Sequence, residues 1–174
     1  MKKTIMIVIG ILVVYYVIGI STSKVIKIPD DSIRFRVIPN SNEPLDQEVK
    51  LLVRDEVQSY MSDILHGVDN IETSRKVISS NLVNINNKVG TVLSNKNYNM
   101  PYNVNFGLNY FPSKKYNGIE YKDGYYESLV ITLGKGEGDN WWCVLFPPLC
   151  LIEAEEGEDV EYTSYVKEML DRYV

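Results

Sequence analysis

Residues 33–57 read IRFRVIPNSNEPLDQEVKLLVRDEV, and within this stretch the hydrophobic pattern changes its period. Apolar residues alternate with arginines over 33–37, which predicts a half-buried β-strand. Two prolines then interrupt the pattern, and from Pro44 to Leu65 apolar residues recur every three or four positions, as in an amphipathic helix. A strand that leads directly into such a helix predicts a domain in which both kinds of element pack on each other.

The polar residues of this predicted helix lie on its other side. Asp46, Lys50 and Arg54 fall away from the apolar stripe, so they are expected to face solvent. His66 and Gly67 follow the last apolar residue, and a glycine at this place is typical of a helix end.

The rest of the chain adds further helices and strands. Apolar spacing predicts one helix over about 72–93, although its many asparagines lower its helix propensity, and a last helix over about 160–173. Period-two alternation predicts strands over 102–110, 125–133 and 141–146, the second of them buried on both faces. This order predicts an α+β fold, a two-layer sandwich of a mostly antiparallel sheet with helices on one face.

The first residues have the layout of an export segment. Lys2 and Lys3 precede an uncharged apolar run over 5–20, and small polar residues follow. This layout is typical of a signal peptide, or of a membrane anchor that stays uncut. Membrane contact is therefore expected only through this segment, and only if it is not removed. The predicted organisation is 1–23 signal peptide or anchor, 24–31 linker, and 32–174 globular domain with an acidic connection over 153–161.

The chain is acidic. It carries 18 Lys and Arg against 23 Asp and Glu, a formal charge of −5, and removal of residues 1–23 with their two lysines leaves 16 against 23, or −7. Nucleic-acid binding depends on basic side chains that neutralise phosphates. The composition therefore argues against a nucleic-acid partner.

The sequence contains no arrangement that indicates metal or cofactor chemistry. Cys143 and Cys150 are seven positions apart, outside the spacing of zinc knuckles, and His66 is the only histidine. A cysteine nucleophile would need a base, and a histidine at a helix end more often has a structural role. The loop GKGEGDN at 134–140 lacks the features of a phosphate-binding loop, so we interpret it as a flexible hairpin connection. We expect no metal, no cofactor and no enzyme activity.

Both cysteines lie in the stretch NWWCVLFPPLC, residues 140–150, together with both tryptophans and two adjacent prolines. Export would permit a disulfide, and Pro147 and Pro148 can turn the chain so that Cys143 and Cys150 approach each other. Such a bond would stabilise the domain by about 2–3 kcal/mol in the chain-entropy model. The C-x-x-C redox motif is absent, so a structural disulfide is favoured, with two independent buried thiols as the alternative.

The apolar residues of the same stretch could either pack in the core of the domain or contact a binding partner. If 141–146 is a strand, one tryptophan points inward and its neighbour outward, and the two prolines end the ladder. Part of this loop should then lie at the surface, where clustered aromatic residues are typical of binding hot spots. For each single residue an ordinary place in the core is the competing interpretation.

Three stretches of this sequence resemble the stage II sporulation protein R family. They are WWCVLFPPLC, the stretch 33–57 quoted above, and YESLVITLGKGEGDNWW at 126–142. The chain departs from the family at Pro39, where a small residue is more usual, and residues 153–174 are weakly characteristic. The resemblance implies a signal that is made in the forespore and exported into the space between forespore and mother cell. There it would activate a membrane-embedded aspartic protease, which processes the pro-form of the mother-cell sigma factor.

The main hypothesis is therefore a non-enzymatic signalling ligand that is secreted, or anchored to the forespore membrane and facing that space. It would dock on the protease through the 141–149 loop and the segment from Arg36 to Asp46. The expected contact residues are Trp141, Trp142, Phe146, Pro147, Pro148, Leu149, Arg36, Asn40, Ser41 and Asp46. The alternative is an exported cell-wall-associated hydrolase or its accessory protein, and a disulfide oxidoreductase would additionally need a reactive thiol at one of the cysteines.

Overall fold

The computed structural model describes residues 9, 26–27, 31–116 and 119–149 of the 174. The predicted C-terminal helix and acidic connection lie outside these residues. The elements in chain order are β1 (Ile26–Lys27), β2 (Ile33–Ile38), α2 (Pro44–Leu65), α3 (Ile71–Ser80), α4 (Leu82–Asn95), β3 (Tyr102–Phe111), β4 (Lys114–Tyr116), β5 (Ile119–Tyr121), β6 (Gly124–Leu133) and β7 (Trp141–Phe146).

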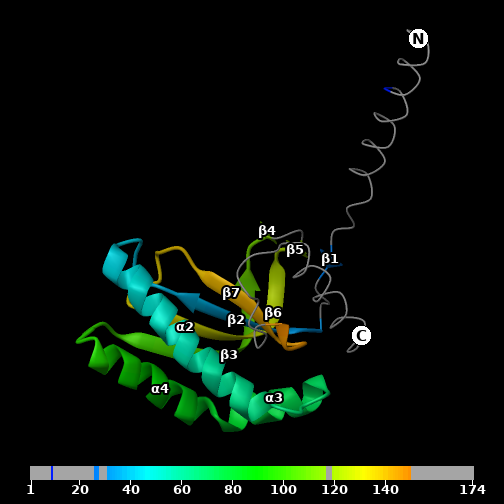
Figure 1. Ribbon diagram of the computed structural model, residues 1–174, viewed down its shortest axis with the longest axis horizontal. Coiled ribbons are helices and arrows are strands. Elements are labelled where there is room, and N and C mark those ends of the chain that lie inside the picture. Colours follow the sequence, from blue (N-terminus) through cyan, green and yellow to red (C-terminus); the bar gives the residue numbers. More distant parts are fainter. Residues whose placement is uncertain (1–8, 10–25, 28–30, 117–118, 150–174) are drawn as a thin grey trace.

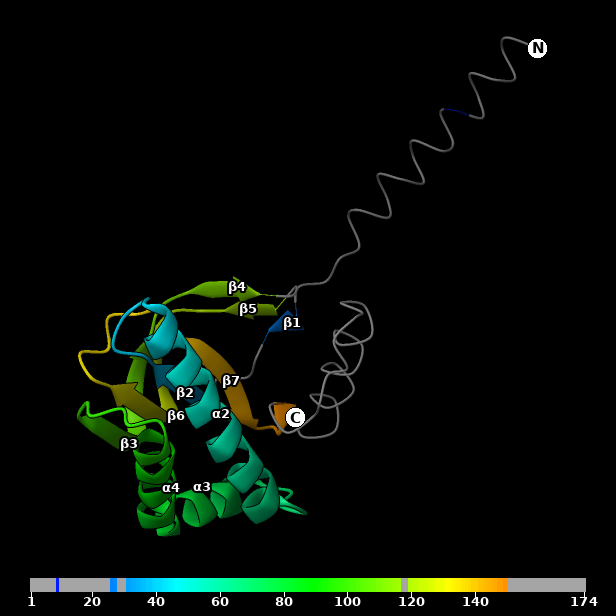
Figure 2. The ribbon, with the colours of Figure 1, turned by 60° about the vertical axis from the view of Figure 1, so that its left-hand side comes forward.

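A four-stranded sheet forms the centre of the domain, in the order β3-β6-β2-β7 (Figure 1). The outer pairs β3–β6 and β2–β7 are antiparallel, and the central pair β2–β6 is parallel. The α2, α3 and α4 helices gather on one side of this sheet (Figure 2), so the α+β prediction is confirmed. The sequence did not predict a second, three-stranded sheet β1-β5-β4, whose β1 lies within the predicted linker.

The α2 helix forms as its sequence predicts. Pro44 occupies the first turn, where its missing N–H costs nothing, and the helix ends at Leu65 before Gly67, whose φ of 72° suits a glycine. The expectation that Asp46 and Lys50 face solvent is wrong, because the two side chains are only 6% and 8% exposed. Their hydrogen bonds, described below, explain why these charged groups can lie in the interior.

The prediction of a single helix over 72–93 is wrong, because the helix breaks at Asn81. The backbone of Asn81 has φ −104° and ψ 6°, and its N–H donates to the carbonyl of Ile78. Its side chain donates to the carbonyl of Val77 and accepts from the Tyr60 hydroxyl at 2.7 Å. An asparagine that bonds its own backbone in this way competes with regular helix, which accounts for the break.

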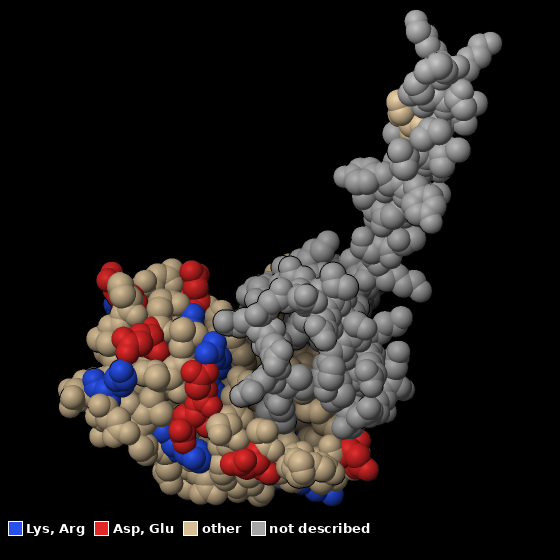
Figure 3. All heavy atoms as spheres, viewed as in Figure 1, with Lys and Arg blue, Asp and Glu red and all other residues tan. Residues whose placement is uncertain are grey.

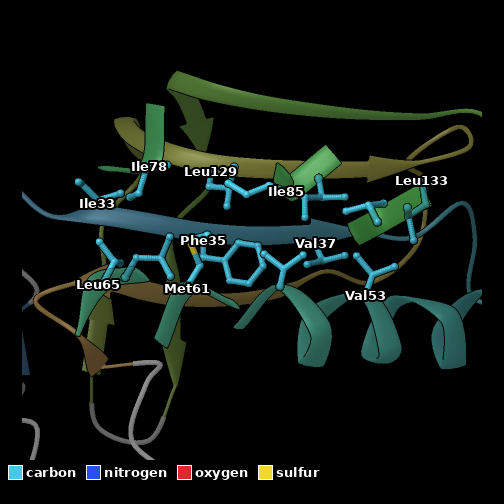
Figure 4. Close-up of a cluster of buried hydrophobic side chains, with 14 of the residues drawn as sticks. Ile33, Phe35, Val37, Val53, Met61, Leu65, Ile78, Ile85, Leu129 and Leu133 are labelled. Carbon is cyan, nitrogen blue, oxygen red and sulfur yellow. The ribbon is translucent and has the colours of Figure 1, made fainter. Parts of the chain in front are cut away.

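The main core lies between the helices and one face of the sheet. Alternate residues of β2 and β6 point toward the helices, and Figure 4 shows them meeting side chains from α2, α3 and α4. The fully buried members of this cluster include Ile33, Phe35, Val37, Val53, Met61, Ile78, Ile85, Leu129, Ile131 and Leu133. The predicted burial of the 128–133 segment on both faces is confirmed, since Ser128 and Val130 are buried on the opposite face.

Charged residues of both signs alternate on the surface of the helices. Lys88 of α4 pairs with Glu56 of α2 at 2.6 Å, and Lys96, directly after α4, pairs with Glu48 of α2 at 2.7 Å. Figure 3 shows the two signs interspersed on the face in view. Within the part of the chain that the structure describes, none of the helices has the length and apolar character that a membrane span requires.

Candidate docking surface

The two stretches predicted to contact a partner lie side by side in the sheet. Strand β7 pairs with β2, and the register places Trp141 opposite Val37 and Trp142 opposite Arg36. Strand β7 is the last strand at this side of the four-stranded sheet within the described residues. The fold therefore brings the tryptophans and the segment after Arg36 to one edge.

The two tryptophans lie on opposite faces of the sheet, which confirms the predicted alternation. Trp141 packs on the helical side, where its ring centroid is 5.4 Å from that of Phe35 in an edge-on arrangement. The guanidinium carbon of Arg54, from α2, lies 5.5 Å from the centre of the Trp141 ring. Both tryptophan side chains are partly buried, so each combines a packed part with a part at the surface.

Trp142 belongs to a second aromatic cluster on the face away from the helices. Its ring lies 5.2 Å from Phe111, and the guanidinium of Arg36 lies 5.5 Å from Trp142 and 5.4 Å from Phe111. Arg34 is only 2% exposed, and its guanidinium carbon lies 3.2 Å from the centre of the Tyr126 ring. Stacking on aromatic rings stabilises the charged guanidinium groups in this partly buried environment.

Arg36 is held in place at both ends of its guanidinium. It donates to the carbonyl of Tyr110 at 3.2 Å. The amide of Asn140, oriented with its nitrogen toward the carbonyl of Gly138, accepts from Arg36 at 2.6 and 3.1 Å. Burial lowers the pKa of Arg36 from its ordinary value. These contacts fix a cation beside Trp142 and thereby limit the orientations of both side chains.

Asn40, Ser41 and Asp46 form a hydrogen-bond network at the start of α2. The Asp46 carboxylate accepts from Asn40 at 2.8 Å, from Ser41 at 2.6 Å and from the Tyr98 hydroxyl at 2.6 Å. Burial works against the charge, but the bonds from Ser41, Tyr98 and Asn40 outweigh it and hold the pKa of Asp46 below its ordinary value. Burial, and then the bond to Asp46, raise the pKa of Tyr98. These three predicted contact residues thus bond to one another and organise the loop.

The glycine loop 134–140 rests on the 39–42 loop. The side-chain oxygen of Asn40 accepts from the N–H of Lys135 at 3.0 Å, and that of Asn42 accepts from the N–H of Asp139 at 2.6 Å. Because β2 lies between β6 and β7, this loop crosses the end of β2, and its interpretation as a hairpin connection is wrong. A β-carbon on Gly138 would collide with the carbonyl of Ser41, so the close approach of the two loops requires glycine there.

Lys50 joins this arrangement from α2. Its ammonium donates to Gln47 at 2.5 Å and to the carbonyl of Asp139, two residues before Trp141, at 3.0 Å. Sequence reasoning missed both Lys50 and Tyr98. For Lys50 a signal existed: it lies four residues after Asp46 and one after the apolar Val49, within reach of the buried stripe. For Tyr98, in the turn after α4, the sequence carries no such signal.

The remaining predicted contact residues are more deeply placed. Phe146 is 6% and Leu149 3% exposed, Pro147 is buried and Pro148 partly buried. The surface part of the 141–149 loop therefore consists mainly of the two tryptophans and Pro148. Cys150 lies outside the described residues, so the disulfide between Cys143 and Cys150 stays a prediction.

We define the docking surface as Arg36, Arg54, Trp141 and Trp142, supported by the network of Asn40, Ser41 and Asp46. It contains two tryptophan–arginine pairs, one on each face of the sheet at the β7 edge. The 39–42 and 134–140 loops, which hydrogen-bond to each other, lie at the same end of the domain. Tryptophan and arginine are the residues most enriched in binding hot spots. Among the described residues, no three His, Cys, Asp or Glu side chains are placed to hold a metal ion.

Comparison with known proteins gives one consistent result. Residues 29–156 match the family described as stage II sporulation protein R (spore_II_R). The chain is 38% identical over 141 residues to the stage II sporulation protein R of Bacillus subtilis (strain 168), which covers 81% of this chain and 63% of that protein. The chain thus aligns with less than two thirds of that relative's length, and no solved structure matches it. The family match includes β2, α2 and the whole docking surface, and the chain belongs to the stage II sporulation protein R family.

Proposed function

We propose that this protein is an exported signal of sporulation that activates a membrane-embedded aspartic protease of the mother cell. The activated protease would then process the pro-form of the mother-cell sigma factor. The protein would act in the space between forespore and mother cell, free or anchored to the forespore membrane. Membership of a sporulation protein family supports a role in sporulation. The docking surface supports the idea that the protein acts by binding a partner.

The observation that carries this proposal is the pair of tryptophan–arginine contacts at one edge of the sheet. Trp141 with Arg54 and Trp142 with Arg36 present partly exposed aromatic rings in fixed orientations. Fixed side chains lose little conformational entropy on binding, so more of the contact energy appears as affinity. A rigid aromatic patch of this kind is suited to a protein partner.

A ligand activates a receptor only by binding its active state more tightly than its inactive state. If Trp141 is a hot spot, its replacement by alanine should cost about 2 kcal/mol or more of binding, roughly a 30-fold loss of affinity. That loss would reduce the fraction of protease held in the active state at any given ligand concentration.

The test is a reconstitution in a vegetative host. The protease and its pro-sigma substrate are co-expressed with this protein, and the processed sigma factor is detected by immunoblot. Trp141→Ala should abolish or strongly reduce processing. The matched control is Tyr60→Ala, which also removes a partly buried aromatic ring from the same core but lies on α2 near α4, away from the docking surface.

Three results would contradict the proposal. The first is the absence of processing with the natural protein at matched expression. The second is full processing with a folded Trp141→Ala protein, which would exclude that residue as an anchor. The third is an equal loss with Tyr60→Ala, which would mean that only the stability of the domain had been measured.

A further inference from the structure

Strand β3 is a long edge strand. It pairs with β6 through ten consecutive residue pairs, from Tyr102 opposite Leu133 to Phe111 opposite Gly124, without a register shift. It stands at the end of the sheet opposite to β7 (Figure 2), and no strand among the described residues pairs with its outer side. Half of its backbone hydrogen-bonding groups therefore point away from the sheet.

This edge lacks the usual protection against pairing with another chain. Natural edge strands carry charges, prolines or bulges, or are short. The β3 sequence YNVNFGLNYF has no charge and no proline, and its ladder with β6 has no bulge. Leu108 is 73% and Tyr110 51% exposed, and Val104 and Phe106 are only partly buried, so the helices leave this edge open. A regular, uncharged, partly apolar edge is a template for one more strand.

The sequence of β3 also indicates which strand would fit. Residues 102–110 read YNVNFGLNY, which is nearly the same in both directions. If two copies pair antiparallel about Phe106, like lies opposite like: Tyr102 faces Tyr110, Asn103 faces Asn109, and Val104 faces Leu108. Aromatic cross-strand pairs are favourable, and none of these pairs places like charges opposite each other. A two-fold interface requires self-complementarity of this kind. If residue i of one copy contacts residue j of the other, then residue j of the first copy also contacts residue i of the second.

We propose that β3 pairs with β3 of a second copy of this chain, antiparallel about a two-fold axis at Phe106. The two four-stranded sheets would then form one continuous sheet of eight strands. The pairing would cover Leu108 and Tyr110, which are otherwise among the most exposed large apolar residues of the domain. Pairing with a second copy explains why the β3 sequence is nearly palindromic. Pairing with an unrelated extended segment would not require a palindromic sequence.

Gly107 has a role in this arrangement. A β-carbon at this position would meet nothing within 4 Å in its own chain, and φ is not in the left-handed region, so nothing within the described chain requires a glycine. In the two-fold register Gly107 lies opposite Asn105, and the missing side chain leaves room for that amide. The Asn105 amide already donates to Asn109 at 2.9 Å on the same face, so asparagines of both copies would form one row.

This inference goes beyond the proposed function and does not rest on it. The docking surface lies mainly along β7, at the opposite edge of the sheet, although Arg36 and Trp142 reach the end of β3 through the Tyr110 carbonyl and the Phe111 ring. A two-fold dimer would present two docking surfaces at once. The experiment below needs neither protease nor substrate, so its failure is distinct from failure of the proposed function.

The test is the association state of the full-length protein in density-matched detergent. Sedimentation equilibrium from about 1 to 100 µM covers the relevant range of dissociation constants. Two variants, called the edge variants, each place a charge on β3. Leu108→Lys replaces an apolar residue near the centre of the interface, and Asn103→Lys replaces an exposed polar residue. The control is Leu51→Lys, at a 39% exposed apolar position on α2, away from β3.

A cysteine pair tests the register. Asn105→Cys protein is mixed with Gly107→Cys protein under mild oxidation. The two-fold register places these positions directly opposite, at a Cα separation of about 4.5–5.5 Å that a disulfide can span. Each variant alone places its cysteines diagonally, too far apart for an unstrained bond. The mixture should therefore form more covalent dimer than either variant alone.

We expect a dimer in the natural protein, a dissociation constant raised at least about tenfold by each edge variant, and a change below about threefold for the control. Three results would overturn the inference: a monomer throughout the concentration range, a dimer that neither edge variant weakens, or cross-linking that the mixture does not favour. Circular dichroism of each variant confirms that a loss of dimer is not a loss of fold.

Discussion

Replacing Asp46 with asparagine tests whether the network at the start of α2 holds the domain together. The carboxylate is 6% exposed and accepts three hydrogen bonds, from Asn40, Ser41 and Tyr98, at 2.6–2.8 Å. Asparagine has the same shape but no charge, and its amide nitrogen cannot accept. Asn40 and Ser41 share one carboxylate oxygen and Tyr98 uses the other, so the donor on the side of the new amide nitrogen would lose its acceptor.

The magnitude follows from these contacts. A hydrogen bond to a charged group contributes about 1.5–3 kcal/mol, and a buried donor without a partner costs about 1–3 kcal/mol. Asparagine retains one oxygen that can serve two of the donors, so we expect a loss of about 2–4 kcal/mol in the free energy of unfolding at pH 7. The first-turn position adds to the effect, because a negative charge there complements the helix dipole.

The effect should also depend on pH. Because the folded pKa of Asp46 is lowered, its charge contributes stability above its unfolded pKa of about 3.9, and this contribution is lost as the pH falls through the folded value. The difference between the natural protein and Asp46→Asn should therefore be full at pH 7 and shrink on acidification.

The assay is urea denaturation followed by tryptophan fluorescence at several pH values, since Trp141 and Trp142 lie close to the network. Asp63→Asn, at an exposed position on the same helix, is the control and should change stability by no more than about 0.5 kcal/mol. The reasoning fails if Asp46→Asn costs less than about 0.5 kcal/mol at pH 7, or if its cost is the same at every pH.

Three further predictions follow from the same structure. Gly138→Ala should lower the free energy of unfolding by about 1–3 kcal/mol, because the new methyl group forces the loop away from the Ser41 carbonyl; an unchanged thermal melt would contradict this. Tyr98→Phe should cost about 1.5–3 kcal/mol at pH 7, and because the folded pKa of the hydroxyl is raised, the difference in denaturation midpoint should shrink as the pH rises above about 10. Cys143→Ser combined with Cys150→Ser should keep sigma-factor processing while lowering stability, whereas loss of processing in a folded double variant would assign the pair a direct role.

Elements that depend on local hydrophobic period could be predicted from the sequence. The strand after residue 32, the long helix after Pro44 and the strand of the two tryptophans all lie where alternation or three-to-four spacing places them. The break at Asn81 was not predicted, because the apolar spacing continues through it and only the bonds of one side chain end the helix. The hydrophobic pattern predicts which face of a helix is buried, but it does not predict where a single polar residue ends the helix.

The candidate site was predictable in its residues but not in their roles. Asn40, Ser41 and Asp46 were expected at the surface as contacts, and the structure turns them toward one another and toward Tyr98, which lies more than 50 positions away. The partners that permit burial of Asp46 and Lys50 come from distant segments, and a single sequence does not indicate such pairings. The same holds for the arginines of β2, whose aromatic neighbours come from β3, β6 and β7.

The position of β2 has a consequence for how the chain acquires its fold. The first strand of the central sheet receives its neighbours last: Arg36 pairs with Val130 and Trp142, which are 94 and 106 positions later (130 − 36 and 142 − 36). A nascent chain therefore cannot complete its sheet until almost the whole domain has emerged, and such non-local pairing folds slowly. If the protein is exported as proposed, this delay would keep the polypeptide unfolded during transit, and the sheet would close around β2 only after export.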